Sequence, residues 1–364
     1  MSQPAPSRQQ IFSGTKEVAE AHRFDERKLE AYLAERIDGF QRPLEVRQFR
    51  GGQSNPTYQL VTPNRKYVLR RKPPGRLLPS AHAVDREFRV ISALHPTGFP
   101  VAKPYLLCED ESIVGTMFYV MECVEGRVIW ESTLPGLEKS QRWPIYDAMN
   151  ETIARLHNFD YEKIGLGDFG KPGAYVARQI SRWTKQYKAS ETETIAEMDK
   201  LIEWLPAHLP QEGRPSVVHG DYRLDNMILH PTEPKVLAVI DWELCTIGDP
   251  LADFTYHLMQ WLMMPGGSTA GTQSLVNADL SALGIPTLDE YIAMYLKRTG
   301  RTERPAMDYY AAYNFFRLAG ILQGIVGRVR DGTAASANAT QNASAVRPLA
   351  QRAWHFAKRA GASD

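Results

Sequence analysis

Three polar residues with the chemistry of a phosphoryl-transfer site follow one another in a short stretch of the sequence. Asp221 precedes Asn226 by five positions, and Asp241 ends an apolar run fifteen positions after Asn226. Phosphoryl transfer needs a carboxylate beside the attacking hydroxyl and oxygen ligands that hold Mg²⁺ against nucleotide phosphates. The spacing therefore predicts Asp221 as the catalytic base and Asn226 and Asp241 as the metal ligands.

The composition predicts a folded protein with two domains or lobes. The chain has 364 residues, of which 43% are hydrophobic and 23% are charged, and a domain usually takes roughly 100 to 200 residues. Because 43 basic residues balance 42 acidic ones, no overall field attracts nucleic acid or an anionic membrane. Three widely spaced cysteines make neither a disulfide framework nor a CxxC metal site.

We expect no membrane-spanning or export segment. The sequence lacks the roughly 20 consecutive apolar residues that span a bilayer, and its first residues, MSQPAPSRQQ, lack the apolar run of a secretory signal. We therefore expect a cytoplasmic protein without a membrane partner. Residues 1–24, with Pro4 and Pro6 near the start, are expected to form a flexible N-terminal tail.

Hydrophobic periodicity predicts an α+β fold, with an antiparallel sheet first and helices after it. In the first third we expect strands at residues 44–48, 58–61, 67–71, 105–108 and 117–123, and helices at 25–37 and 83–94. Beyond Gly126 we expect helices at residues 142–157, 174–188, 191–205, 250–264, 288–298 and 307–330, and short strands at 217–218, 227–230 and 236–241. The low-complexity run at residues 333–345 fits a loop or a weak helix equally well.

Three ordered motifs carry a resemblance to a known family. They are HGDYRLDN at residues 219–226, IDWE at residues 240–243 and GDPLADF at residues 248–254. The chain resembles the aminoglycoside phosphotransferase family, relatives of choline kinases within the protein-kinase-like fold, from about residue 51 to residue 256. The resemblance implies a two-lobed kinase with ATP as co-substrate, Mg²⁺ and a small-molecule hydroxyl acceptor. It implies an N-lobe with a nucleotide-binding sheet at residues 25–122 and a helical C-lobe with the catalytic loop and acceptor site at residues 123–364.

Within this resemblance, RGGQSNPTYQL is the candidate phosphate loop. Its small residues would let backbone N–H groups approach phosphates; they are Gly51, Gly52, Ser54 and Asn55. An ordinary hairpin turn is the alternative. The position of this segment just upstream of the next motif favours the phosphate loop.

Arg70 in YVLRRK occupies the place where kinases usually have a phosphate-holding lysine. Glu87 follows it by seventeen residues on an expected helix, and we expect the two to form an ion pair. A guanidinium binds phosphate bidentately and stays charged, so arginine at this position does not imply an inactive protein. Strand alternation places Lys72 on the same side as Arg70, so either could contact phosphate. The alternative is a solvated basic edge strand.

The apolar strand in FYVMECVEG matches the hinge between the lobes. The resemblance implies that Met121 borders the adenine pocket, that the carbonyl of Glu122 accepts a hydrogen bond from adenine, and that the N–H of Val124 donates one. These roles need only backbone groups, so the alternative for Met121 and Cys123 is an ordinary core strand.

Four polar residues near the motifs have expected supporting roles. His219 is expected to anchor its loop by hydrogen bonding, and Asp249 to cap a helix that starts at Pro250. Asp253 is expected to tie down the catalytic loop. Glu243 is a candidate auxiliary metal ligand.

The acceptor is the least determined part of the prediction. From residue 254 to the end, eleven basic side chains exceed seven acidic ones, which argues against a polycationic antibiotic. The motifs look particularly like the branch fused to acyl-CoA dehydrogenases in animals, which implies a hydroxyacyl-CoA acceptor, with Arg298 and Arg317 as candidate contacts to its phosphates. An aminoglycoside or amino-alcohol kinase and a catalytically silent nucleotide-binding module are the alternatives. The choice between ATP and GTP and the oligomeric state stay open.

Overall fold

The computed structural model describes residues 13–50, 55–74, 82–265, 268–269, 272–302, 304–332 and 339–363. Its contacts divide the chain into two compact units. Unit 1 lies within Met1–Trp130, Ile164–Leu166 and Leu224–Cys245, and unit 2 within Glu131–Lys163, Gly167–Arg223 and Thr246–Asp364. The expected lobe boundary after residue 122 stays a prediction.

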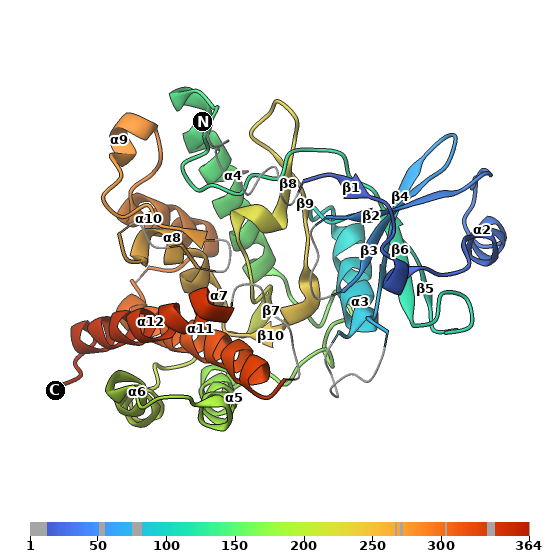
Figure 1. The fold of residues 1–364 in the computed structure, drawn as a ribbon. Coiled ribbons are helices and arrows are strands. Elements are labelled where there is room, and N and C mark those ends of the chain that lie inside the picture. The colour runs from blue at the N-terminus through green and yellow to red at the C-terminus, as the bar shows by residue number, and fades with distance from the viewer. Residues whose placement is uncertain are drawn as a thin grey trace, which may run out of the picture. The chain divides into compact units, whose positions relative to one another are not determined.

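Unit 1 is built around a six-stranded sheet in which all neighbouring strands are antiparallel (Figure 1). In sheet order, the strands are β1 (Thr15–Lys16), β2 (Glu45–Phe49), β3 (Thr57–Val61), β4 (Lys66–Arg71), β6 (Phe118–Glu122) and β5 (Pro104–Cys108). The helical elements before and between the strands are η1 (Glu20–His22), α2 (Glu26–Ala34), α3 (Val84–Leu94) and η2 (His95–Thr97). Strands β2 to β6 and helices α2 and α3 lie close to the expected ones, whereas β1, η1 and η2 were not expected.

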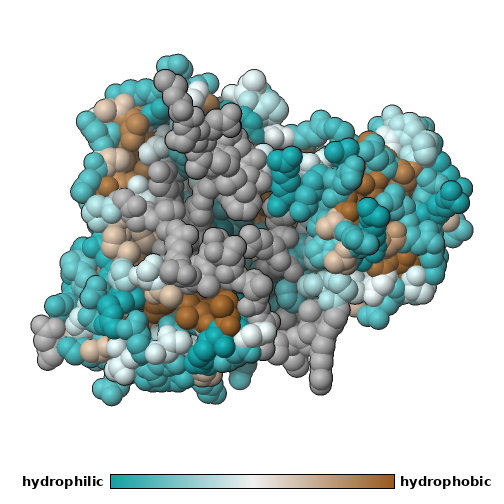
Figure 2. Space-filling view, viewed as in Figure 1, coloured by the Kyte–Doolittle hydropathy of each residue, from teal (hydrophilic) through white to brown (hydrophobic). Residues whose placement is uncertain are grey.

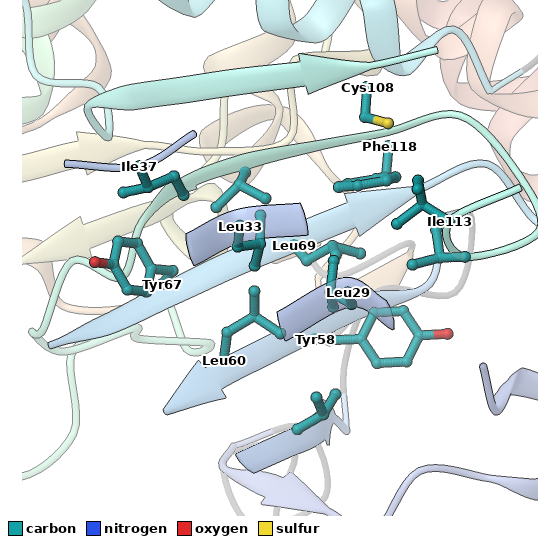
Figure 3. Close-up of a cluster of buried hydrophobic side chains, with 13 residues drawn as sticks. Leu29, Leu33, Ile37, Tyr58, Leu60, Tyr67, Leu69, Cys108, Ile113 and Phe118 are labelled. Carbon is teal, nitrogen blue, oxygen red and sulfur yellow. The ribbon is translucent and has the colours of Figure 1, made fainter. Parts of the chain in front are cut away.

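The core of unit 1 lies between α2 and one face of this sheet (Figure 3). Leu29 and Leu33 of α2 pack against alternate strand residues, among them Leu60 and Leu69. Because side chains alternate along a strand, Arg70, which follows Leu69, points to the opposite face of the sheet. Helix α3 covers that face and contributes Glu87 to it. This alternation separates an apolar face from a polar one.

The expected tail needs correction at its end. Strand β1 pairs with β2 through Thr15↔Phe49 and Lys16↔Gln48. The carbonyl oxygen of His22 accepts hydrogen bonds from the hydroxyl of Tyr58 and from Nη2 of Arg71, both at 3.0 Å. Strand β1 therefore extends the sheet and His22 is tied to it, where a flexible tail was expected, and proline content alone did not indicate this.

A later segment completes unit 1. It contains η3 (Leu224–Asn226), the antiparallel pair β8 (Met227–Leu229) and β9 (Val236–Val239), and η4 (Trp242–Leu244). The N–H of Val239 donates to the carbonyl of Pro100 at 2.8 Å. By its contacts this segment groups with unit 1, although sequence order placed it within the C-lobe.

Unit 2 is mainly helical. Its helices are α4 (Lys139–Asn158), α5 (Tyr175–Ser190), α6 (Ala196–Ala207), α7 (Pro250–His257), α8 (Met259–Leu262), α9 (Leu280–Leu283), α10 (Leu288–Thr299), α11 (Met307–Arg330) and α12 (Ala339–Arg359). Its strands are β7 (Ser216–Val218), β10 (Thr246–Gly248), β11 (Ser268–Thr269) and β12 (Thr272–Gln273).

Helix α11 is the central element of unit 2, and it packs against α5, α7 and α12 (Figure 1). Glycine allows the close approach of α5, since a Cβ atom on Gly327 would lie 2.5 Å from Cβ of Ser190, next to the backbone of that helix. Of the low-complexity run, residues 339–345 belong to α12, whereas residues 333–338 lie outside the described part of the chain. The sheet of unit 1 and the helices of unit 2 confirm the α+β class.

Hydrophilic residues cover most of the coloured surface in Figure 2, with smaller hydrophobic patches between them. Three large hydrophobic side chains of the described residues are exposed, namely Trp143, Leu209 and Leu244. Across the described ranges, no helix has both the length and the apolar character needed to cross a bilayer.

Candidate active site

Arg70 is the centre of a charged cluster on the polar face of the unit 1 sheet. Its Nε lies 2.8 Å from Oε2 of Glu87, and its Nη2 lies 2.6 Å from Oδ1 of Asp241 and 3.5 Å from Oε2 of Glu243. The expected ion pair with Glu87 is present. Lys72 lies instead 3.7 Å from Asp85, so the two cations have different carboxylate partners.

Neighbouring strands hold the cluster in place. The carboxylate of Glu87, whose side chain is 1% exposed, accepts hydrogen bonds from Nδ2 of Asn55 at 2.9 Å and from the hydroxyl of Tyr119 at 3.1 Å. Tyr119 stands opposite Arg70 in the β4–β6 register. Burial lowers the pKa of Arg70, but the carboxylates of Glu87 and Asp241 outweigh it and raise that pKa, so the guanidinium stays charged.

Asn226 and Asp241 are joined through the backbone. The N–H of Ile240 donates to the carbonyl of Asn226 at 2.9 Å, which sets the residue before Asp241 against the end of η3. Asp241 has left-handed backbone angles, φ 66° and ψ 61°, which aspartate tolerates better than most residues. The turn after β9 thus presents Asp241 at the position where β9 and η4 meet.

These donors fit a Mg²⁺ ion. An amide oxygen and a carboxylate are hard ligands of the kind that Mg²⁺ prefers. Among the described residues, no group of three or more His, Cys, Asp or Glu side chains is arranged to hold a metal. A site with few protein ligands suits Mg²⁺ when phosphates and waters complete its shell. Glu243, whose side chain is one quarter exposed, stays a candidate auxiliary ligand.

The candidate phosphate loop is described only in part. Gly51, Gly52 and Ser54 lie outside the described residues. Asn55 is buried, and its side chain serves the Glu87 carboxylate. Its proposed part in phosphate binding therefore concerns its backbone alone.

The candidate adenine contacts lie at the end of β6. Burial is complete through Val120, whereas Met121, Cys123 and Val124 are partly exposed and Glu122 is exposed. An ordinary core strand would stay buried here, so the exposure pattern favours a binding edge. The adenine roles of Met121, Glu122 and Val124 stay predictions.

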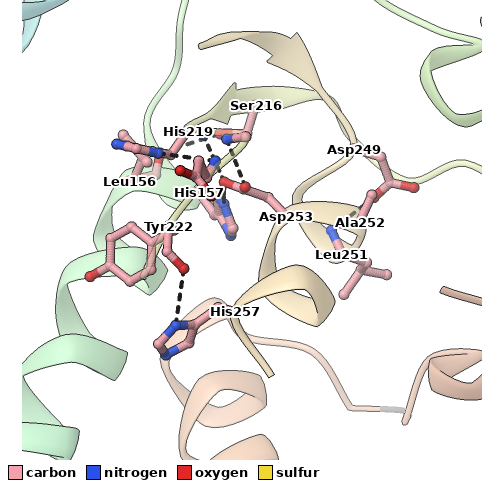
Figure 4. Close-up of polar contacts among 12 residues, drawn as sticks. Leu156, His157, Ser216, His219, Tyr222, Asp249, Leu251, Ala252, Asp253 and His257 are labelled. Atoms are coloured by element: carbon pink, nitrogen blue, oxygen red, sulfur yellow. Dashed lines mark hydrogen bonds and ion pairs between the residues drawn. The ribbon is translucent and has the colours of Figure 1, made fainter. Parts of the chain in front are cut away.

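In unit 2, Asp253 of α7 holds the loop that precedes Asp221 (Figure 4). Its Oδ2 accepts from the N–H of His219 at 2.7 Å, and its Oδ1 accepts from the N–H of Gly220 at 2.9 Å. Nε2 of His157 lies 3.1 Å from the same Oδ2. Burial alone would raise the pKa of Asp253, but its contacts with His157 and His219 lower that pKa by more. The pKa of Asp253 therefore lies below its ordinary value.

The supporting roles inferred from the sequence agree with this geometry. The buried His219 accepts a hydrogen bond from the N–H of Asp221 at its Nδ1, 3.2 Å away, which is a structural contact. Asp249 caps α7 by accepting from the N–H of Leu251 at 2.8 Å. Asp253 ties down the loop as expected.

Two side chains contact Oδ1 of Asp221. Its Oδ1 accepts from the hydroxyl of Tyr256 at 2.7 Å and lies 3.1 Å from Nε of Arg223. Sequence reasoning missed Tyr256, although its position three residues after Asp253 on one helix is a signal that it faces the same loop. Asp221 belongs to unit 2, whereas Asn226 and Asp241 belong to unit 1.

The two arginines expected to contact an acceptor phosphate have partners within unit 2. Arg298 donates through Nη1 to Oδ1 of Asn150 at 2.9 Å and through Nη2 to Oδ1 of Asp147 at 2.8 Å, which joins α10 to α4. Arg317 is only 6% exposed. A count of charges does not show such partners, and contacts of either arginine with an acceptor stay a prediction.

The fold is that of kinase-like phosphotransferases. Residues 45–313 match the family model described as the phosphotransferase enzyme family, and the chain belongs to that family. ATP as co-substrate and a requirement for Mg²⁺ are general in kinases of this type.

Individual proteins agree with this assignment. The chain is 47% identical over 319 residues to acyl-CoA dehydrogenase family member 10 of Mus musculus, covering 88% of this chain but only 30% of that protein. It is 52% identical to a Ralstonia eutropha protein provisionally assigned as an aminoglycoside phosphotransferase, with a TM-score of 0.84 and coverage of 93% and 99% of the two chains. Choline kinase from Cryptosporidium parvum has the same fold, with a TM-score of 0.59, 12% identity and coverage of 92% and 94%.

Proposed function

We propose that this chain is an ATP- and Mg²⁺-dependent small-molecule kinase in which Asp221 is the catalytic base, and that its acceptor is a hydroxyacyl-CoA. The family assignment supports hydroxyl phosphorylation as the reaction class. The roles of individual residues and the identity of the acceptor do not follow from the family assignment and are part of the proposal.

The observation that carries the proposal is the contact of Arg70 with both Glu87 and Asp241. Arg70, which is expected to bind phosphates, lies next to Asp241, which is expected to bind the metal. A metal-bound nucleotide would therefore contact both side chains. Bound Mg²⁺ neutralises charge on the phosphates and orients them. Asn226 and Asp241 would hold it, while Arg70, kept in place by Glu87, contacts phosphate oxygens.

Asp221 accepts the proton of the acceptor hydroxyl as that oxygen attacks the γ-phosphorus. The O–H bond of the acceptor breaks, a new P–O bond forms, and the bond from the γ-phosphorus to ADP breaks. Other residues of the chain orient the catalytic base. Asp253 fixes the loop before the base, and Tyr256 binds the base itself.

The remaining nucleotide contacts are part of the same proposal. We assign the adenine edge to the backbone of Glu122 and Val124, with Met121 beside the ring. Backbone N–H groups of Gly51, Gly52, Ser54 and Asn55 are assigned to the phosphates. Support comes from their place in the sequence and, for β6, from the partly exposed strand end.

Two observations support a hydroxyacyl-CoA as acceptor. A relative covering 88% of this chain carries the name of an acyl-CoA dehydrogenase family member, and residues 254–364 have more basic than acidic side chains. An aminoglycoside is the second candidate, favoured by the provisional assignment of the Ralstonia eutropha protein.

A nucleotide-consumption screen tests the proposal directly. Hydroxyacyl-CoAs, amino alcohols, sugars and aminoglycosides are each incubated with the chain, Mg²⁺ and either ATP or GTP, and phosphorylated products are identified by mass spectrometry. We expect the highest kcat/KM with a hydroxyacyl-CoA and ATP. Faster turnover of an aminoglycoside overturns the acceptor assignment but keeps the kinase assignment. Absence of phosphorylated product from every acceptor, with nucleotide binding intact, favours a catalytically silent module.

A further inference from the structure

Two residues outside the sequence motifs hold the loop that carries Asp221. Tyr256, in the last turn of α7, donates its hydroxyl to Oδ1 of Asp221 at 2.7 Å. Arg317, near the middle of α11, donates from Nη2 to the carbonyl oxygen of Gly220 at 2.7 Å. One residue contacts the carboxylate and the other contacts the peptide that leads into it.

The same arginine also holds the tyrosine. The guanidinium carbon of Arg317 lies 4.9 Å from the ring centroid of Tyr256 and 5.9 Å from that of Trp183 on α5. Both distances are within the range of cation–π attraction. Arg317 thus links the backbone before Asp221 to the side chain that binds Asp221.

The backbone around Gly220 is fixed from both sides. Asp253 accepts from the N–H of Gly220, and Arg317 donates to its carbonyl oxygen. Because a peptide group is planar, these contacts fix the peptide before Gly220 and the one after it. Gly220 has φ +84°, a conformation that suits glycine.

The burial of Arg317 is informative, because moving a charged arginine side chain out of water costs free energy. Arg317 is only 6% exposed, and a buried charge destabilises a protein unless its partners compensate. An apolar side chain would fill the space among α5, α7 and α11 at lower energetic cost. Two of the partners of Arg317 are linked to Asp221, since the carbonyl of Gly220 directly precedes it and the ring of Tyr256 carries the hydroxyl that binds it.

We propose that Tyr256 and Arg317 are positioning residues for the catalytic base, a proposal that rests on the function proposed above. The carboxylate is planar, so anchoring Oδ1 sets the orientation in which Asp221 meets the acceptor hydroxyl. Tyr256 keeps its own proton throughout and transfers none. Burial, together with the Asp221 carboxylate, raises the pKa of Tyr256, in keeping with a permanent donor.

Tyr256→Phe is the main variant, and Tyr309→Phe is its matched control. Tyr309 is also a buried tyrosine, and its hydroxyl donates at 2.7 Å to the carbonyl of Leu205, away from Asp221. Each variant loses the one hydrogen bond that its buried tyrosine donates, and the two bonds have the same length. With the best acceptor from the screen, we expect Tyr256→Phe to lower kcat by roughly 10- to 100-fold, with KM for ATP within about twofold. Tyr309→Phe should keep kcat.

Arg317→Lys and Arg317→Met separate positioning from packing. Lysine can still donate to the carbonyl of Gly220, whereas methionine fills space without donating. We expect Arg317→Lys to keep more of kcat than Arg317→Met when both are assayed well below their melting temperatures. Equal kcat in the two variants would argue that Arg317 acts through packing alone.

A crystallographic comparison decides the inference even if no acceptor is phosphorylated. High-resolution structures of the unmodified chain, Tyr256→Phe and Tyr309→Phe report the side-chain conformation of Asp221. We expect a rotated or multiple carboxylate conformation in Tyr256→Phe and an unchanged one in Tyr309→Phe. An unchanged Asp221 in Tyr256→Phe overturns the inference, whereas a lack of turnover by the unmodified chain bears on the proposed function instead.

Discussion

Nη2 of Arg70 lies 2.6 Å from Oδ1 of Asp241, although the two residues are 171 positions apart in the chain. The same guanidinium binds Glu87 through Nε. An arginine at a position usually held by lysine therefore connects the sheet, helix α3 and the turn after β9 within unit 1. Its planar group presents several donors at once, which a lysine ammonium cannot do in the same geometry.

The first prediction concerns this cluster and stability. Arg70→Met leaves the buried carboxylate of Glu87 without its cation, and breaking a buried pair in this way destabilises by about 3–5 kcal/mol. Urea unfolding should show a loss of that size in the free energy of unfolding. Arg36→Met is the control, because Arg36 and its partner Glu35 are exposed and exposed pairs contribute about 0–1 kcal/mol. Similar losses in the two variants would contradict the prediction.

The second prediction concerns the metal ligands. Asp241→Ala removes a carboxylate assigned to Mg²⁺, so Mg-ATP should no longer raise the melting temperature of the variant. Thermal melts with and without Mg-ATP measure the effect. Glu35→Ala, which removes an exposed carboxylate in the same unit, should keep the full shift. A full shift in Asp241→Ala would show that the metal is held elsewhere.

The third prediction concerns His257 and pH. Its Nδ1 lies 3.2 Å from the carbonyl of Tyr222, and its Nε2 lies 2.7 Å from the hydroxyl of Tyr291. A carbonyl only accepts, so Nδ1 carries a proton, and in the neutral ring Nε2 accepts from the hydroxyl of Tyr291. Burial lowers the pKa of His257 to about 4, against smaller opposing effects of Tyr222 and Asp253.

Between pH 6.5 and about pH 4, the unfolded chain then binds a proton at this histidine that the folded chain does not. The free energy of unfolding should therefore fall as pH decreases through this window, by up to about 3 kcal/mol from His257. Urea unfolding at pH 7, 6 and 5 measures the slope. His257→Gln should flatten it, whereas His208→Gln, at an exposed position, should leave it unchanged. An equally steep slope in His257→Gln would count against a neutral buried ring.

The sequence predicted the parts of the site that depend on local order. The resemblance to kinases predicted the pair of Arg70 with Glu87, which is present, and strand alternation placed Arg70 and Lys72 on one side of β4. The loop at Asp221 and the cap at Asp249 follow from motifs and from helix-end preferences. All of these are relationships between residues near one another in sequence.

The parts that sequence missed depend on distant contacts. Arg317 and Gly220 are 97 positions apart, and no periodicity relates them. Arg298 counted as a free positive charge until its contacts with Asn150 and Asp147 were visible. Residues 13–24 had the composition of a tail, but hydrogen bonds to Tyr58 and Arg71 hold them to the sheet.

The role of Asp221 is the central claim, and Asp221→Asn tests it most directly. The variant keeps the shape of the side chain but cannot accept the proton, so turnover of the best acceptor should fall by about 10²- to 10⁴-fold. Affinity for Mg-ATP, measured by calorimetry, should stay within about twofold, since the base contacts the acceptor. Asp289→Asn, at an exposed carboxylate, serves as the control and should keep full turnover. Undiminished phosphorylation by Asp221→Asn would contradict the assignment of Asp221 as the base.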